Sequence, residues 1–293
     1  MSQRTLTPAL LPTLWVITAA LCPAQAGRAE LSGAVQDPSG LPVLRAKVEA
    51  EDQATNVRYF SLTDERGEYH ILGLPSGQYV LTVEQPGFRI YRQSGITLRL
   101  AERAALDVKL EAGLPTQSVE VTASAALLQS ASGEVSLNVD ERRISTLPLD
   151  GRNFIPLVTL APGVALPNGN FLPRINGSRP RTNEYIYDGL SVLQPEPGQV
   201  VFYPIIDGMA EFKLNINAYS PEYGRSNGGT VMVIGKSGTN QLHGSAFEFF
   251  RNEALNARNL FAQPGPNPEF RRNQYGLTLG GPIQSNKTFF FVD

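Results

Sequence analysis

The sequence predicts a mainly β protein with a β-sandwich first, a small mixed α+β domain next, and the first strands of an incomplete transmembrane β-barrel last. Residues 30–112 alternate apolar and polar side chains between turn signals spaced by roughly ten residues. Residues 125–240 carry short helical and strand patterns and no long periodic helix. Residues 241–293 contain longer alternating runs, of the length that a strand needs to cross a membrane.

Residues 1–26 have the three parts of a signal peptide. Arg4 supplies a weak positive start, residues 10–21 are apolar, and Ala24-Gln25-Ala26 is an A-x-A cleavage site. An uncleaved anchor is the alternative. Cleavage after Ala26 removes the only Cys and the only Trp of the chain. We therefore expect an exported protein that uses no disulfide.

Composition excludes several classes of function. The formal net charge is -2, so the chain offers no basic field for nucleic acid. A mature chain without Cys has no thiolate ligand or thiol nucleophile. The two histidines, His70 and His243, lie far apart in the sequence and cannot build the His and Glu cluster of a zinc peptidase. We expect no enzyme activity, no metal and no cofactor.

The first segment reads as strands with one buried and one solvated face. Turns are indicated at 37–40, 64–67, 74–77 and 85–88 by Gly, Pro and Asp. Between them, side chains of the expected inner face recur at every second position. These are Ala46, Val48 and Ala50; Tyr79, Leu81 and Val83; Ile96, Leu98 and Leu100; and Leu106, Val108 and Leu110.

The motifs GAVQDPSGLPV and TDERGEYHILGLPSGQYVLTVEQPGF in this segment resemble the carboxypeptidase-regulatory-like domain. The resemblance covers nearly all of residues 30–112 and implies a seven-stranded, transthyretin-like sandwich. Tyr69 and Tyr79 are interpreted as core aromatics and not as a binding platform.

Residues 113–124 form an expected linker after the sandwich. Pro115 ends the first domain, and the run SVEVTA (118–123) is β-prone. This run resembles the TonB box of TonB-dependent outer-membrane receptors, which the periplasmic energy transducer pulls. The resemblance implies a candidate transducer-binding segment that consists of Val119, Glu120, Val121, Thr122 and Ala123. A plain linker strand is the alternative.

The middle segment, 125–240, is predicted to mix short helices and strands. Asp140 is placed to cap a helix that ends near Leu147. Phe154, Leu157 and Leu160 fall at helical spacing before Pro162-Gly163. Strands are expected at 184–188, 211–216 and 230–234.

Three blocks of this segment resemble the plug and first barrel strand of TonB-dependent receptors, above all the Oar-like group. They are LPLDGRNFIPLVTLAPGV (147–164), RINGSRPRTNEYIYDGLSV (174–192) and a run over 211–252. One departure is Gly235, where the group tends to carry Thr. The resemblance implies that four arginines are candidate contacts between plug and barrel: Arg152, Arg174, Arg181 and Arg225. For each of them, a solvated loop charge is the alternative.

The last segment, 241–293, is expected to begin a barrel. Strand patterns occur at 241–252, at 274–280 and from Lys287 onward. The first connection is long and the second is short, as between extracellular loops and periplasmic turns. This places the N-terminal domains in the periplasm. Because three strands cannot close a barrel, we expect the chain to be a fragment.

The resemblance implies a TonB-dependent receptor in the outer membrane. Such a protein contacts outer-membrane lipid, binds an extracellular substrate that this sequence does not specify, and uses a TonB-type periplasmic transducer as its partner. It makes and breaks no covalent bond. The alternative is a soluble envelope or surface-binding, adhesive protein built from β-sandwich modules.

Overall fold

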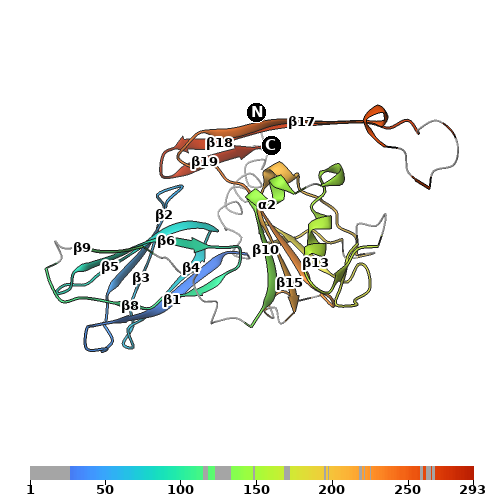
Figure 1. Cartoon of the computed structure of the whole chain (residues 1–293). Helices are drawn as coiled ribbons and strands as arrows, with labels where there is room; N and C mark the ends of the chain where they lie inside the picture. Colours follow the sequence, from blue (N-terminus) through green and yellow to red (C-terminus); the bar gives the residue numbers. More distant parts are fainter. Residues whose placement is uncertain are drawn as a thin grey trace, which may run out of the picture.

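Strands in three separate groups of sheets form the framework of the described residues (Figure 1). The structure is a computed structural model that describes residues 27–114, 118–122, 133–147, 149–167, 172–194, 196, 198–217, 220, 222–224, 226–257, 260–261, 265 and 268–293. The expected signal peptide, 1–26, lies outside the described residues, as do Ala123 and Arg225.

The first group is a sandwich of two sheets, made by residues 29–109 and the strand at 118–122; we call it the sandwich. One sheet has the order β4-β1-β7, with β8 also paired to β1. The other has the order β3-β2-β5-β6-β9. The strands are β1 Ala29–Gln36, β2 Lys47–Asp52, β3 Arg58–Leu62, β4 Glu68–Leu74, β5 Gly77–Glu84, β6 Ile90–Leu98, β7 Arg103–Ala105, β8 Val108–Lys109 and β9 Ser118–Thr122.

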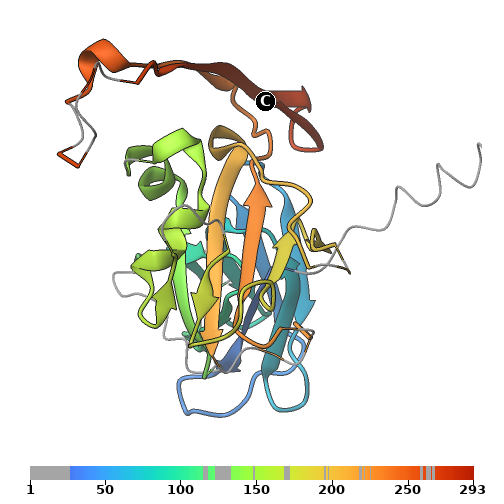
Figure 2. The same ribbon diagram turned by 90° about the vertical axis from the view of Figure 1, so that its right-hand side faces the viewer.

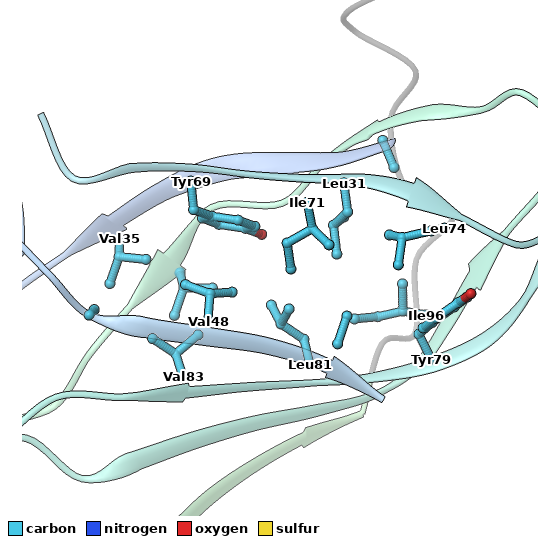
Figure 3. Close-up of a cluster of buried hydrophobic side chains, with 14 of the residues drawn as sticks. Leu31, Val35, Val48, Tyr69, Ile71, Leu74, Tyr79, Leu81, Val83 and Ile96 are labelled. Atoms are coloured by element: carbon cyan, nitrogen blue, oxygen red, sulfur yellow. The ribbon is translucent and has the colours of Figure 1, made fainter. Parts of the chain in front are cut away.

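The sandwich core contains the predicted inner-face residues of β2, β5 and β6, together with unpredicted residues of β1 and β4, namely Leu31, Val35, Ile71 and Leu74 (Figure 3). The alternating side chains of β2 and β5 are fully buried, as expected. Tyr69 and Tyr79 are also fully buried, and each hydroxyl donates to a backbone carbonyl, of Leu106 and Pro75 respectively. Both tyrosines are therefore core residues whose polar atoms are satisfied within the fold.

Leu100 corrects the predicted sandwich core. β6 ends at Leu98, and Ala101 takes a left-handed φ of 49°, so the chain turns away from the sheet. Leu100 remains buried, at 2% exposure, but packs with Ile186, Tyr223 and Met232 instead of with the sandwich. The expected strand at 106–110 is likewise shorter, because only Val108–Lys109 pairs with β1.

The second group is a five-stranded sheet of order β10-β15-β16-β13-β14 with short helices on one face; residues 133–240 form this plug-like body. Strands β11 and β12, which lie between β10 and β13 in the sequence, form a separate two-stranded sheet. The elements are β10 Val135–Asp140, α2 Glu141–Thr146, η1 Asp150–Arg152, η2 Ile155–Leu160, β11 Val164–Ala165, β12 Arg174–Ile175, β13 Glu184–Tyr187, β14 Leu190–Ser191, η3 Ile206–Gly208, β15 Met209–Asn217 and β16 Thr230–Gly235.

The predicted elements of the plug-like body are confirmed with shifted ends. The Asp140 carboxylate accepts from the backbone N–H of Arg143 and caps α2, as the sequence indicates. Phe154 and Leu157 are buried, whereas Leu160 is 56% exposed. The run is a 3-10 helix whose last residue is Leu160, so this side chain lies at the exposed end of the element.

The third group is an antiparallel sheet of three strands, β17 His243–Asn252, β18 Arg271–Gln284 and β19 Thr288–Val292, with η4 Glu253–Leu255 after β17. We call it the three-stranded sheet. All three predicted strands are present, although β18 extends beyond the predicted 274–280 at both ends. It extends across one end of the sandwich and the plug-like body (Figures 1 and 2). In the described part of the chain, none of the helices combines the length and apolar character of a membrane span.

Candidate functional site

Side chains of opposite polarity alternate between the two faces of β18 in the three-stranded sheet. Tyr275 and Leu277 of β18 are 81% and 64% exposed. Their neighbours point the other way: the Gln274 amide donates to the carbonyl of Gly151 in the plug-like body over 3.4 Å, and Thr278 is 7% exposed. On β18 the apolar side chains are thus turned outward and the polar side chains inward, as on a barrel strand that faces lipid. β17 is mixed: Phe247 and Phe249 share the inner face with Gln274, and Glu248 shares the outer face with Tyr275.

Arg152 joins the plug-like body to the inner face of this sheet. Its guanidinium lies 4.5 Å from the ring centre of Phe247 and 4.2 Å from that of Phe249, both on β17. The same guanidinium forms an ion pair with Asp207 of η3, and both side chains are mostly buried. An Arg held over aromatic faces and paired with a carboxylate combines cation–π attraction with charge neutralisation.

The backbone around Arg152 is unusual. Gly151 has a φ of 71° and Arg152 a φ of 53°, so two successive residues occupy the left-handed region. Such a conformation is uncommon for a residue with a side chain and persists where the surroundings hold it in place. Here the carboxylate of Asp207 and the two rings of β17 do so.

Two cavities meet at Arg152, and both lie between the plug-like body and the three-stranded sheet. One has a volume of about 740 Å³ and extends past Tyr203 and Phe247. The other has a volume of about 590 Å³ and extends past Leu149 and Phe249. Arg152 therefore bridges a contact that is otherwise loosely packed.

The other candidate arginines lie elsewhere. Arg174, on β12, and Arg181, which has a φ of 70°, are both exposed and line neither of these two cavities. Arg225 lies outside the described residues. Among the described candidates, the structure thus places Arg152 alone against the three-stranded sheet.

The candidate transducer-binding segment belongs to the sandwich. Residues 118–122 form β9, which pairs in parallel with β6, Ser118 opposite Ile90 and Thr122 opposite Ser94. β9 is the last strand of its sheet. Glu120 is exposed and Val121 is 37% exposed. Instead of a free linker, the segment is an ordered edge strand.

A buried polar joint, which the sequence did not reveal, holds the sandwich to the plug-like body. The Glu211 carboxylate of β15 accepts from the backbone N–H of Leu100 over 2.9 Å. Lys213 donates from Nζ to the carbonyl of Ala101 over 3.0 Å and pairs with Glu134 over 3.1 Å. We call this set the joint.

Burial dominates the electrostatics of the joint. Glu211 is 8% exposed, and desolvation raises the pKa of its carboxyl to about 7. The Leu100 N–H, Arg99 and Lys213 act in the opposite direction, while Glu102 adds to the increase. In the sequence, Glu211, Lys213 and Asn215 simply alternate with apolar residues of an expected strand, and only the packing of the sandwich against this face buries the three side chains.

A second contact ties the sandwich to the three-stranded sheet. The Asn56 amide, in the turn between β2 and β3, donates to Asn286 Oδ1 in the turn between β18 and β19 over 2.9 Å. Asn240 donates to the same oxygen from its side chain and to the carbonyl of Ala54 from its backbone. The sandwich therefore contacts the three-stranded sheet at its short turn.

Among the residues that the structure describes, no group of three or more His, Cys, Asp or Glu side chains is arranged to hold a metal ion.

Two parts of the chain match known protein domains, and one relative matches most of it. Residues 30–111 match the carboxypeptidase regulatory-like domain, and residues 234–293 match an outer membrane beta barrel domain. The TonB-dependent transporter Oar of Myxococcus xanthus is 32% identical over 245 residues, which are 79% of this chain and 23% of that protein. The chain thus spans less than a quarter of the length of this relative.

Solved structures resemble parts of the chain. The siderophore receptor PirA of Acinetobacter baumannii is 19% identical and aligns with a TM-score of 0.40 over 51% of this chain and 22% of its own. Catechol 1,2 dioxygenase of Acinetobacter radioresistens is 15% identical, with a TM-score of 0.25 over 35% of this chain and 58% of its own. These scores are too low to support conclusions about function.

The sequence matches agree with the fold. A regulatory-like sandwich, a plug-like body and strands of outer-membrane type occur here in one chain, in that order. The chain is a homologue of the TonB-dependent transporter Oar, and it combines a carboxypeptidase regulatory-like domain with a match to an outer membrane beta barrel domain.

Proposed function

We propose that this protein is a TonB-dependent outer-membrane transporter, which moves an extracellular substrate inward and makes no covalent change in it. One observation carries the proposal: the three-stranded sheet exposes Tyr275 and Leu277 and turns Gln274 and Thr278 toward the plug-like body. Outward apolar side chains suit lipid, and inward polar side chains suit a lumen that contains a plug.

Localisation follows from the same sheet. The long connection, 253–270, lies at one end of the β17–β18 pair, and the short turn, 285–287, contacts the sandwich through Asn286. Short turns of outer-membrane barrels face the periplasm. We therefore place the sandwich and the plug-like body on the periplasmic side of the outer membrane.

Fractionation tests this localisation. The protein is expected in the outer-membrane fraction and to stay there through washes with high salt and with carbonate. Recovery in the soluble fraction would refute the transporter and favour the soluble, surface-binding alternative. Exposed Tyr275 and Leu277 would then have to be covered by another protein.

The proposed partner is a TonB-type periplasmic transducer. Val119 to Ala123 is the segment that we expect it to bind, by adding a strand through backbone hydrogen bonds. Val121→Pro removes one backbone donor and should lower the affinity for the purified periplasmic domain of the transducer by at least about tenfold. Val121→Thr keeps the donor and the β-branched shape and is the matched control. Equal binding by both variants would exclude this segment as the binding site.

We also propose Arg152 as a contact between plug and barrel. Its position between Asp207 and the rings of Phe247 and Phe249 supports this role. The exposed positions of Arg174 and Arg181 give no such support. Movement of the plug would require the guanidinium to leave the two rings.

A further inference from the structure

The sandwich holds β9 by only one of its two backbone edges. β9 pairs with β6 in a parallel register and is the terminal strand of the order β3-β2-β5-β6-β9. Every strand of a sheet has two edges with hydrogen-bonding groups. In the described part of the chain, the second edge of β9 pairs with no other strand.

Side chains on β9 are compatible with stable docking on β6. Glu120 stands opposite Arg92, and both are exposed, so opposite charges are neighbours on the outer surface. On the other face, Val119 stands opposite Tyr91, and both are partly buried. The segment is therefore held by its backbone and has compatible neighbours on both faces, while no described strand pairs with its outer edge.

Pre-ordering matters for recognition by strand addition. A flexible segment loses conformational entropy when it becomes a strand, and that loss weakens binding. A segment that is already extended in a sheet has lost this freedom before the partner arrives. An open edge on an ordered strand is thus a better acceptor for a partner strand than a free linker of the same sequence.

We propose that the sandwich presents β9 to the energy transducer, whose strand adds to the open edge of β9 while β9 stays paired with β6. This inference rests on the proposed function, because it specifies how the transducer meets the segment. Sandwich and transducer then share one continuous sheet. Force on β9 would reach the sandwich, which contacts the three-stranded sheet through Asn56 and Asn286. The competing arrangement is displacement, in which β9 must leave β6 before it binds.

A disulfide between β6 and β9 distinguishes presentation from displacement. Residues 27–293 contain no Cys, so Arg92→Cys with Glu120→Cys introduces the only thiols of this part of the chain. Both positions are exposed and directly opposite, so the core is untouched. The full-length protein is solubilised from outer membranes, oxidised or reduced, and titrated with the purified periplasmic domain of the transducer.

Presentation predicts that the oxidised protein binds at least as tightly as the reduced protein, to within about threefold. A loss of more than about tenfold on oxidation alone would overturn the proposal and establish displacement. If neither form binds, while the unmodified protein also fails to bind, the proposed function itself is refuted. Glu49→Cys with Phe60→Cys, which joins β2 to β3 at the opposite edge, is the matched control.

Hydrogen exchange provides a second readout that needs no disulfide. In the unmodified complex, backbone amides of Ile90–Ser94 should stay as protected as in the free protein, since β9 still covers them. Amides of Ser118–Thr122 should gain protection from the added strand. Faster exchange in Ile90–Ser94 on binding would overturn the proposal.

Discussion

Leu100→Ala should detach the sandwich from the plug-like body without unfolding either. Leu100 is 2% exposed and packs against Ile186, Tyr223 and Met232, whereas the sandwich has its own core. Removing a buried leucine side chain beyond Cβ costs about 2–5 kcal/mol. We expect the lower end, about 2–3 kcal/mol, because an interface between two bodies can relax more easily than a closed core. The variant keeps the backbone N–H of residue 100, from which the Glu211 carboxylate accepts a hydrogen bond.

That loss corresponds to a shift of about 30- to 150-fold in the docking equilibrium. Hydrogen exchange on the intact protein measures it, as faster exchange of amides at 99–103. Leu98→Ala is the matched control: Leu98 is the same residue, 1% exposed and two positions away, but packs in the sandwich core.

The two variants should have different signatures. Leu98→Ala should speed exchange throughout the sandwich, including Tyr79 and Leu81, because it destabilises the core that contains them. Leu100→Ala should leave those amides unchanged. If Leu100→Ala speeds exchange at Tyr79 and Leu81 as much as Leu98→Ala does, the joint is not a separable contact and the reasoning fails.

Three further predictions concern charged side chains. Burial raises the pKa of Glu211 from 4.5 to about 7, so docking of the sandwich on the plug-like body should be strongest below about pH 4.5 and weaken by up to about 3 kcal/mol as the pH rises through 7. Glu211→Gln should remove this pH dependence from the exchange rates of amides 99–103. A pH profile that is the same in the variant would contradict the role of Glu211. Arg152→Ala should lower the stability of the plug-like body by about 2–4 kcal/mol, because Asp207 is left without its cation and two ring contacts are lost; calorimetry measures the loss, and full recovery by Arg152→Lys would argue against the ring contacts. Asp140→Ala should destabilise α2 by about 1 kcal/mol through loss of the cap, seen as faster exchange in residues 141–146, whereas Asp140→Asn should have little effect.

Much of the fold was predictable because it depends on local pattern. Alternation at Ala46, Val48 and Ala50 identified a strand and its buried face, since successive side chains of a strand point in opposite directions. Asp140 indicated the start of α2, because its carboxylate satisfies a backbone N–H within the same turn. Alternation at Tyr275 and Leu277 likewise defined β18, although it did not by itself state which face is exposed.

The candidate site was less predictable because it depends on contacts between distant segments. Arg152 was one of four arginines with equal claims in the sequence, and only the packing of η1 against β17 selects it. The run at 118–122 was recognisable as β-prone, but its partner was not. Parallel pairing uses backbone groups that every residue has, so the sequence carries little signal for the choice of β6.

By itself, the sequence determined which segments become strands, which faces are apolar, and that the chain resembles a TonB-dependent receptor. The tertiary structure alone decided that Leu98 and Leu100, in one alternating run, serve different cores, and that Glu211 and Lys213 are buried instead of solvated. The physical reason is range: alternation is fixed by the geometry of one strand, whereas burial of a face depends on which other body packs against it.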